Sequence, residues 1–174
     1  GVSFVEAEDL YTKELKALAG DVIKDRKLTH ISLDDVNVPV GEFSPEMQGA
    51  QSAYYSPSEA GNRISANTPE TLVHELGHAR DYENRMMSEG WDNPSDIASA
   101  ASRRMNEGGT ESLKRLLPII RDETVANKNM LQDLYRSRGL GAAIRGGWKM
   151  LPGYGTYLTD LASRLKVPGS IAAA

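Results

Sequence analysis

Apolar residues recur at two different periods along the chain, and the change of period divides it into segments. Residues 4–26 carry leucine, valine and isoleucine at helical spacing, which predicts an amphipathic helix. His30 to Asp34 alternates between polar and apolar residues, which predicts a half-buried strand. Residues 37–45 contain two prolines and a glycine, so we expect a loop there.

The next stretch predicts a β-hairpin followed by a helix. Short strands are expected at 51–55 and 63–66, joined by a connection rich in turn-forming residues. Thr68 or Asn67 then suits the N-cap of a helix, and Pro69 suits its first position. The helical pattern continues to about residue 87 and is ended by Gly90 and Pro94.

Two further helices are predicted in the second half of the chain. One covers residues 97–105 and is followed by the Gly108-Gly109 break. The other lies within 113–135, and its first residue is either Leu113 or Pro118, since proline favours a helix start. Its predicted buried face consists of Leu113, Leu116, Leu117, Ile120, Leu131, Leu134 and Tyr135.

Within the helix that follows Thr68, the residues His74, Glu75 and His78 form the pattern H-E-x-x-H. Positions i and i+4 lie on one side of a helix, about 6 Å apart along its axis, so both imidazoles can bind one zinc ion. Glu75 is turned by about 100° around the helix axis from His74, so it can lie beside the metal and take a proton from a zinc-bound water. Gly77 either allows close backbone packing beside the metal or is merely tolerated.

A catalytic zinc site usually has three protein ligands, so a third must come from elsewhere in the chain. Cysteine is absent, and Asp81 and Asn84 stand where the extended motif H-E-x-x-H-x-x-G-x-x-H has its glycine and its last histidine. On the 113–135 helix, Glu123 projects within roughly 60° of the centre of the apolar face, whereas Asp122 points roughly 160° away from that centre, toward solvent. Glu123 is therefore the predicted ligand, and a buried ion pair with an arginine is the alternative.

Two more polar residues are candidates for hydrogen bonds to the ligands. Asp81 follows His78 by three residues and can accept from the distal nitrogen of a liganding histidine. Alternatively, Asp81 pairs with Arg85 one turn further on. Asn127 lies one turn past Glu123 and is expected to face inward with it.

Taken together, these residues resemble the gluzincin class of zinc metallopeptidases, especially its compact minigluzincin members. The resemblance rests on His74-Glu75-x-x-His78 and on Glu123-x-x-Ala126-Asn127, and it spans roughly residues 28–137. The segments 53–57 and 62–65 also resemble segments of that family. The resemblance implies an α+β, zincin-like fold, in which a small, mostly antiparallel sheet packs on the active-site helix and on a glutamate-bearing helix.

The same resemblance implies an activity and a substrate. The protein would be a zinc-dependent metalloendopeptidase that hydrolyses a peptide or protein, with Glu75 as general base and later as donor to the leaving amine. In the family one of the two strands lines the substrate cleft, which makes Ala53, Tyr54 and Tyr55 candidate substrate-binding residues. Compact members of this kind often occur in phages and mobile elements.

Length and composition fit one globular domain, with 174 residues of which 40% are hydrophobic. We expect a catalytic domain over 1–137 and an extension over 138–174. Stretches of ~18 consecutive apolar residues are missing, so no membrane span is expected. Gly1 to Leu10 lacks the basic and apolar regions of a signal peptide, so a cytoplasmic or virion-associated location is expected.

Charge is distributed unevenly along the chain. Residues 1–135 hold 14 basic and 23 acidic residues, a net charge of −9, whereas residues 136–174 hold 6 basic and 1 acidic, a net charge of +5. The glycine-rich, basic extension is expected to dock on the acidic body. Contact with nucleic acid or a membrane surface is the alternative.

A different class of function stays open at this stage, namely a zinc-binding virion or regulatory protein without peptidase activity. Its mark would be a fourth protein ligand that closes the metal site, and His30 and Asp81 are the plausible donors. Cleavage preference, the residue that stabilises the oxyanion and the oligomeric state are not indicated by the sequence.

Overall fold

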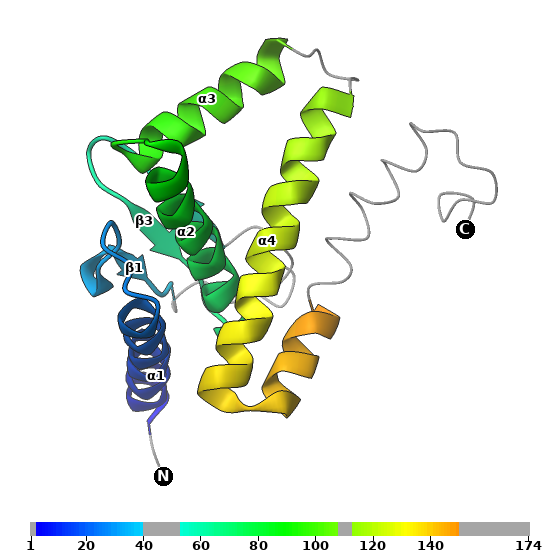
Figure 1. Ribbon diagram of the computed structural model, residues 1–174. Coiled ribbons are helices and arrows are strands. Elements are labelled where there is room, and N and C mark those ends of the chain that lie inside the picture. The colour runs from blue at the N-terminus through cyan, green and yellow to red at the C-terminus, as the bar shows by residue number, and fades with distance from the viewer. Residues whose placement is uncertain (1–2, 40–52, 108–112, 150–174) are drawn as a thin grey trace, which may run out of the picture.

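The computed structural model describes residues 3–39, 53–107 and 113–149, and it has an α+β fold (Figure 1). Long helices make up most of it, and a small sheet packs beside them. The elements are α1 (Phe4–Asp25), the short 3-10 helix η1 (Leu33–Asp35), β1 (Val36–Asn37), β2 (Tyr54–Ser56), β3 (Arg63–Ser65), α2 (Pro69–Glu89), α3 (Pro94–Glu107) and α4 (Leu113–Arg138), and residues 140–149 are also helical.

The helix α1 matches the segment predicted from the apolar period. It begins with a capping box in which Ser3 and Glu6 each accept a hydrogen bond from the backbone N–H of the other. Its inner face is formed by Leu15, Leu18, Ala19 and Val22, which are all buried. The predicted amphipathic helix over 4–26 is therefore confirmed.

The helix α2 is also confirmed, and both of its ends follow from local sequence. The side chain of Thr68 accepts from the backbone N–H of Thr71, and Pro69 stands where a free N–H would lack a partner. Gly90 ends the helix with φ of 78°, a left-handed conformation that side chains disfavour.

The sheet is mixed, with strand order β1-β3-β2. The hairpin of β2 and β3 is antiparallel, as predicted, but β1 pairs with β3 in parallel. The expectation of a mostly antiparallel sheet therefore needs this correction. The edge position of β2 leaves its outer side unpaired within the described residues.

The predicted strand over 30–34 is wrong. Asp35 accepts a hydrogen bond from the backbone N–H of Ser32, which favours the turn of η1 over an extended strand. The backbone N–H of His30 donates to the side chain of Glu83, so it is not available for a β-ladder. The strand β1 begins only at Val36, and of the loop predicted at 37–45, residues 40–45 lie outside the described part of the chain.

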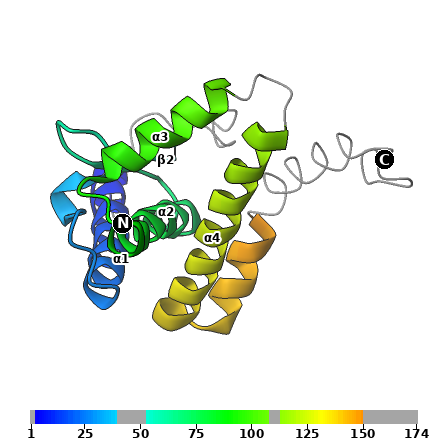
Figure 2. The same cartoon turned by 45° about the horizontal axis from the view of Figure 1, so that its top comes forward.

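The helix α2 lies between α1 and α4, and Figures 1 and 2 show α4 running beside it. The two helices approach so closely that a Cβ on Gly77 would lie 2.6 Å from the carbonyl oxygen of Ala126. Of the two interpretations of Gly77, close backbone packing is therefore the one found. The buried core gathers Leu15, Leu18, Val22, Leu28, Ile31, Val36, Ile64, Leu72, Val73, Leu76, Met130 and Leu134.

The buried face of α4 differs from the predicted one. Leu117, Leu131 and Tyr135 are exposed, while Ala126 and Leu134 are buried. The same buried stripe holds Asn129 and Asp133, and it includes Met130. The prediction misplaced the face because it counted only apolar residues, whereas these two polar side chains are buried with hydrogen-bond partners. Asn129 donates to the carbonyl of Gly77, and Asp133 accepts from the guanidinium of Arg26.

Of the predicted extension, residues 140–149 are described and form a helix next to α4 (Figure 2). Gly146 packs against the side chain of Leu134, and the amine of Lys149 lies 3.1 Å from the carboxylate of Glu70. The part of the predicted extension from 150 to 174 lies outside the described residues. Among the described helices, none has the length and apolar character needed to cross a membrane.

Candidate metal centre

Two facing helices supply a group of three potential metal ligands. The Nε2 atom of His74 lies 3.1 Å from Oε2 of Glu123, and the Nε2 atom of His78 lies 3.2 Å from its Oε1. The two imidazole rings meet edge to face, with centroids 4.8 Å apart. Each residue has a donor atom that lies within 4.8 Å of the other two. The structure thus brings together the three residues that the sequence predicts as ligands.

The geometry of this group fits one tetrahedral cation. Two donor atoms that bind the same zinc ion at 2.0–2.1 Å lie roughly 3.3 Å apart. The two nitrogen–oxygen distances, 3.1 and 3.2 Å, are close to this separation. In the described part of the chain, Glu123 has these histidines and not an arginine as its ion-pair partners, contrary to the alternative drawn from the sequence.

The electrostatics of the group favour a positive charge beside the carboxylate. Burial raises the pKa of Glu123, but hydrogen bonds from His74 and His78 outweigh it and hold that pKa well below its usual range. Burial lowers the pKa of His78, but the hydrogen bond to Glu123 and the nearby carboxylates outweigh it, so that pKa is raised. A metal ion that replaced the protons between the two histidines and Glu123 would be attracted by the same carboxylate.

Glu75 lies beside this group and is buried, with 8% of its surface exposed. Burial raises the pKa of its carboxyl, and the charges of His78 and His74 oppose the rise only in part. The backbone N–H of Tyr55 lies near this carboxylate and also opposes the rise. A base with a raised pKa is suited to accept a proton near neutral pH.

Two buried polar atoms near the ligands are left without hydrogen-bond partners among the described residues, Nδ1 of His74 and Oδ1 of Asn127. Asn127 lies on α4 one turn past Glu123, as the sequence predicts. When Nε2 of His74 binds a cation, its Nδ1 carries a proton and needs an acceptor, which an amide oxygen provides. Nδ1 of His74 would therefore need an acceptor on metal binding, and Oδ1 of Asn127 is a buried acceptor that is not yet used.

Asp81 has neither of the partners predicted for it. Its carboxylate accepts two hydrogen bonds from Arg121, at 2.6 and 3.1 Å. Arg85 instead pairs with Glu89 and Asp122. Asp81 thus ties α2 to α4 two residues before Glu123. No local pattern indicates this pair, because its partners are 40 residues apart.

The three predicted substrate-binding residues, which lie in β2 or directly before it, differ in how far they are buried. Tyr54 is 41% exposed, while Ala53 and Tyr55 pack partly buried against the core. The phenol of Tyr55 hydrogen-bonds to Nε2 of His30 at 2.8 Å, so its side chain is turned away from the solvent. Its backbone is the part that reaches Glu75.

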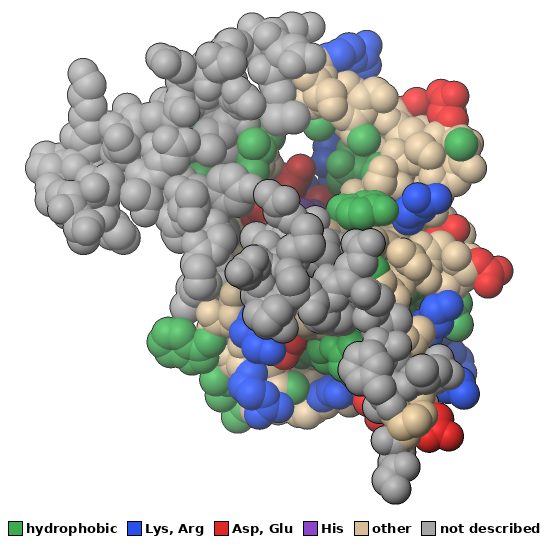
Figure 3. All heavy atoms as spheres, turned by 180° about the vertical axis from the view of Figure 1, so that it is seen from behind, with side chains coloured by type: hydrophobic (Ala, Val, Ile, Leu, Met, Phe, Trp, Pro, Cys, Tyr) green, Lys and Arg blue, Asp and Glu red, His purple; other side chains and the backbone are tan. Residues whose placement is uncertain are grey.

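The residues considered as a fourth metal ligand, His30 and Asp81, both have other partners. The ring nitrogens of His30 lie 2.9 Å from Glu83 and 2.8 Å from the phenol oxygen of Tyr55. The three-residue group of His74, His78 and Glu123 is also partly open, since the side chain of Glu123 is 27% exposed. Acidic and histidine atoms are visible deep in a hollow of the surface in Figure 3.

Comparison of the whole chain with protein-family models, with curated proteins and with solved structures finds no match.

Proposed function

We propose that this protein is a zinc-dependent peptidase of the gluzincin type. The observation that carries the proposal is the convergence of two imidazoles and one carboxylate, with a buried glutamate beside them. Two histidines and a glutamate are a ligand set found in catalytic zinc sites, which leave one coordination position open. The side chains that would close such a position, His30 and Asp81, are bound elsewhere.

The residues of the site divide the proposed reaction among them. His74, His78 and Glu123 would hold the ion, which when bound supplies an acidified water and polarises the carbonyl of the scissile amide. Glu75 takes the proton of the attacking water as the new carbon–oxygen bond forms. It then delivers this proton to the leaving nitrogen as the carbon–nitrogen bond breaks, so that it ends the cycle ionised.

The proposed substrate is a peptide or protein in extended conformation. The strand β2 lies at an edge of the sheet, and the backbone of Tyr55 within it reaches Glu75. An extended peptide can add to such an edge through backbone hydrogen bonds. Its scissile bond would then run past the general base.

The test uses the purified full chain with a peptide library and a parallel metal analysis. We expect about one zinc per chain, and cleavage that a chelator abolishes and added zinc restores. The variant Glu75→Gln should retain its zinc and lose cleavage, because the amide cannot accept the proton. Zinc binding without cleavage of any peptide would favour a binding protein instead.

A further inference from the structure

A second buried cluster of polar side chains lies on another side of α2. Glu83 is turned by roughly 140° around the helix axis from His78. Its carboxylate accepts hydrogen bonds from both Thr29 and His30, which follow α1 in the chain. The imidazole of His30 then reaches the phenol of Tyr55 on β2. One chain of hydrogen bonds thus joins three separate segments.

The protons in this chain can be assigned. Burial raises the pKa of Glu83, but hydrogen bonds from His30 and Thr29 outweigh it and lower that pKa, so the carboxylate is ionised and only accepts. Nδ1 of His30, 2.9 Å from this carboxylate, therefore carries a proton. Burial raises the pKa of Tyr55, so its hydroxyl stays protonated and takes part in the 2.8 Å hydrogen bond with Nε2 of His30.

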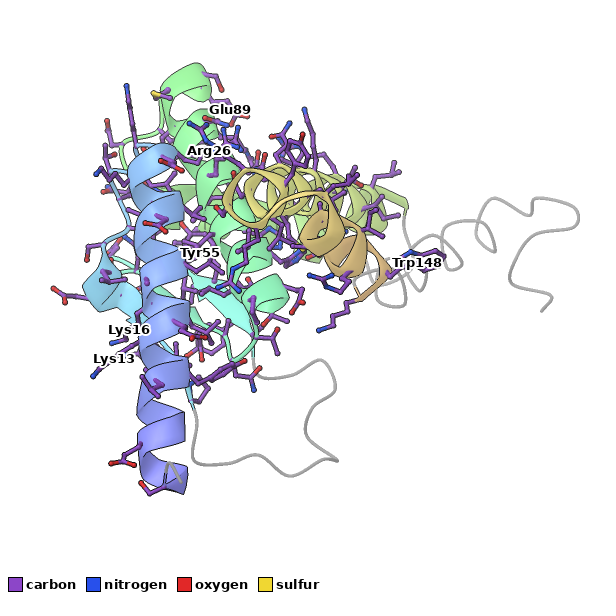
Figure 4. All side chains as sticks on the ribbon, turned by 90° about the horizontal axis from the view of Figure 1, so that it is seen from below. Lys13, Lys16, Arg26, Tyr55, Glu89 and Trp148 are labelled. Atoms are coloured by element: carbon purple, nitrogen blue, oxygen red, sulfur yellow. The ribbon has the colours of Figure 1, made fainter. Side chains whose placement is uncertain are left out.

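Tyr55 is the point at which this chain meets the metal centre. Its ring packs edge to face on that of Tyr82, with centroids 5.3 Å apart, and Figure 4 shows the side chain pointing into the interior. The backbone N–H of the same residue lies near the carboxylate of Glu75. The side chain is held both by His30 and by the ring of Tyr82, so the place of Tyr55 is defined on two sides.

The strand β2 needs such an anchor because its ladder is short. It pairs with β3 over three residue positions, from Tyr54 to Ser56, and lies at the sheet edge. Short edge segments with few buried contacts open more readily than the core. A displacement of the strand would move the backbone that lies near Glu75, and a displacement of about 1 Å can reduce a catalytic rate roughly 100-fold.

We propose that Glu83, His30 and Tyr55 form a positioning relay that fixes β2, and through its backbone the carboxylate of Glu75. The role in catalysis rests on the peptidase function proposed above. The relay touches neither the metal ligands nor the reacting atoms, so its three side chains are positioning residues. Its effect should appear in the catalytic rate and not in the metal content.

The first test compares two tyrosines that each lose only a hydroxyl. In zinc-loaded full chain, Tyr55→Phe should lower kcat about 10- to 100-fold with KM and zinc content nearly unchanged. The matched control Tyr82→Phe removes a phenol oxygen from the ring that packs on Tyr55 and should leave kcat within about twofold of the wild type. Equal kcat values in the two variants would overturn the relay.

A second test replaces His30 by the two amides. In His30→Gln the amide oxygen can take the place of Nε2 and accept from Tyr55, whereas in His30→Asn the amide reaches only Glu83. We expect His30→Gln to keep at least about five times the kcat of His30→Asn. A structural role alone would affect both variants alike, so equal losses would also overturn the relay.

A third measurement does not depend on activity. Amide hydrogen exchange at residues 54–56 should be about 10-fold faster in Tyr55→Phe than in Tyr82→Phe, while exchange in α2 stays the same. If the wild type cleaves no peptide, the peptidase proposal fails, and faster exchange still supports the fixing of β2. Unchanged exchange at 54–56 would overturn the relay whatever the activity.

Discussion

Two clusters of histidine and glutamate pack on helix α2, and they differ in how completely their polar atoms are used. In the cluster of His30 and Glu83, both ring nitrogens and both carboxylate oxygens have partners. In the metal centre, Nδ1 of His74 has none among the described residues, and neither does Oδ1 of Asn127. A fully satisfied cluster makes the fold rigid, whereas an unsatisfied one is destabilising until a ligand completes it.

The two clusters also differ in their access to solvent. The side chain of Glu83 is 9% exposed and that of Glu123 is 27% exposed. The closed cluster is therefore suited to hold segments together, and the open one to bind something from outside. The predictions below separate these two roles, beginning with the largest expected effect.

The largest effect should follow from Glu123→Ala. It removes one of three proposed ligands and leaves two imidazoles on a single helix, so zinc affinity should fall by more than about 100-fold. Competition titration with a chromophoric chelator measures this loss. The fold should survive, since Glu123 is partly exposed, and far-ultraviolet circular dichroism is the control. Unchanged affinity would remove Glu123 from the ligand set.

The next effect concerns the closed cluster and stability. Glu83→Gln replaces a carboxylate that accepts from Thr29 and His30 by an amide with one acceptor oxygen. At least one donor would then lack its partner, so urea denaturation should show a loss of about 1–3 kcal/mol. Zinc affinity should stay within about twofold, since supporting partners of the metal are not touched. Loss of zinc without loss of stability would reverse the roles given to the clusters.

A somewhat smaller effect is expected from Gly77→Ala at the contact of α2 and α4. The new Cβ would lie 2.6 Å from the carbonyl oxygen of Ala126, so α4 must shift. Thermal denaturation should show a loss of about 1–2 kcal/mol, and zinc should bind more weakly. The matched control Gly20→Ala lies in α1 with nothing within 4 Å, and there helix propensity should stabilise by roughly 0.5–1 kcal/mol. Equal stability of the two variants would show that the helix contact tolerates a methyl group.

Sequence patterns were sufficient for the elements that depend on local signals. The ends of α2 follow from Thr68, Pro69 and Gly90, and the three proposed ligands follow from helical spacing. The prediction failed where distant side chains decide the outcome. Glu83 takes the backbone N–H of His30 out of a predicted strand, although 53 residues separate them. Such pairings leave no periodic signal along the chain.

The buried face of α4 was misplaced for the same physical reason. The pattern treats Asn129 and Asp133 as surface residues, and it cannot show that Gly77 and Arg26 supply their partners. Glu123 was nevertheless placed correctly, because the predicted and the observed faces overlap on its side of the helix.

A modest effect on affinity is expected from Asn127, whose buried amide oxygen has no partner among the described residues and would have to move within hydrogen-bond distance to accept from Nδ1 of His74. Asn127→Leu should lower zinc affinity about 10-fold, since partners of liganding histidines contribute at this level. Asn127→Asp should bind zinc at least as tightly as the wild type, because a carboxylate is the stronger acceptor. Isothermal titration with zinc measures both. Equal affinities in the two variants would show that this oxygen does not serve His74.

The smallest expected effect is a dependence of the zinc-induced stabilisation on pH. In protein from which a chelator has removed zinc, the pKa of His78 is raised. The contribution of His78 to the stability of the fold is therefore complete below the unfolded pKa of about 6.5 and is lost as pH rises through the folded pKa. The pKa of Glu123 is lowered, so its stabilisation is present above about 4.5 and is lost only as pH falls. Zinc requires unprotonated imidazoles, so the rise in Tm that it causes should be larger at pH 8 than at pH 6.

The closed cluster provides the internal reference for this pH experiment. The pKa of Glu83 is lowered by its hydrogen bonds, so its contribution disappears only in acid and is the same with and without zinc. Differential scanning fluorimetry between pH 5 and 8, with zinc and with chelator, separates the two. Because the difference between the two curves isolates the metal centre, a zinc-induced rise in Tm that is equal at pH 6 and pH 8 would mean that the cation is not held by His74 and His78.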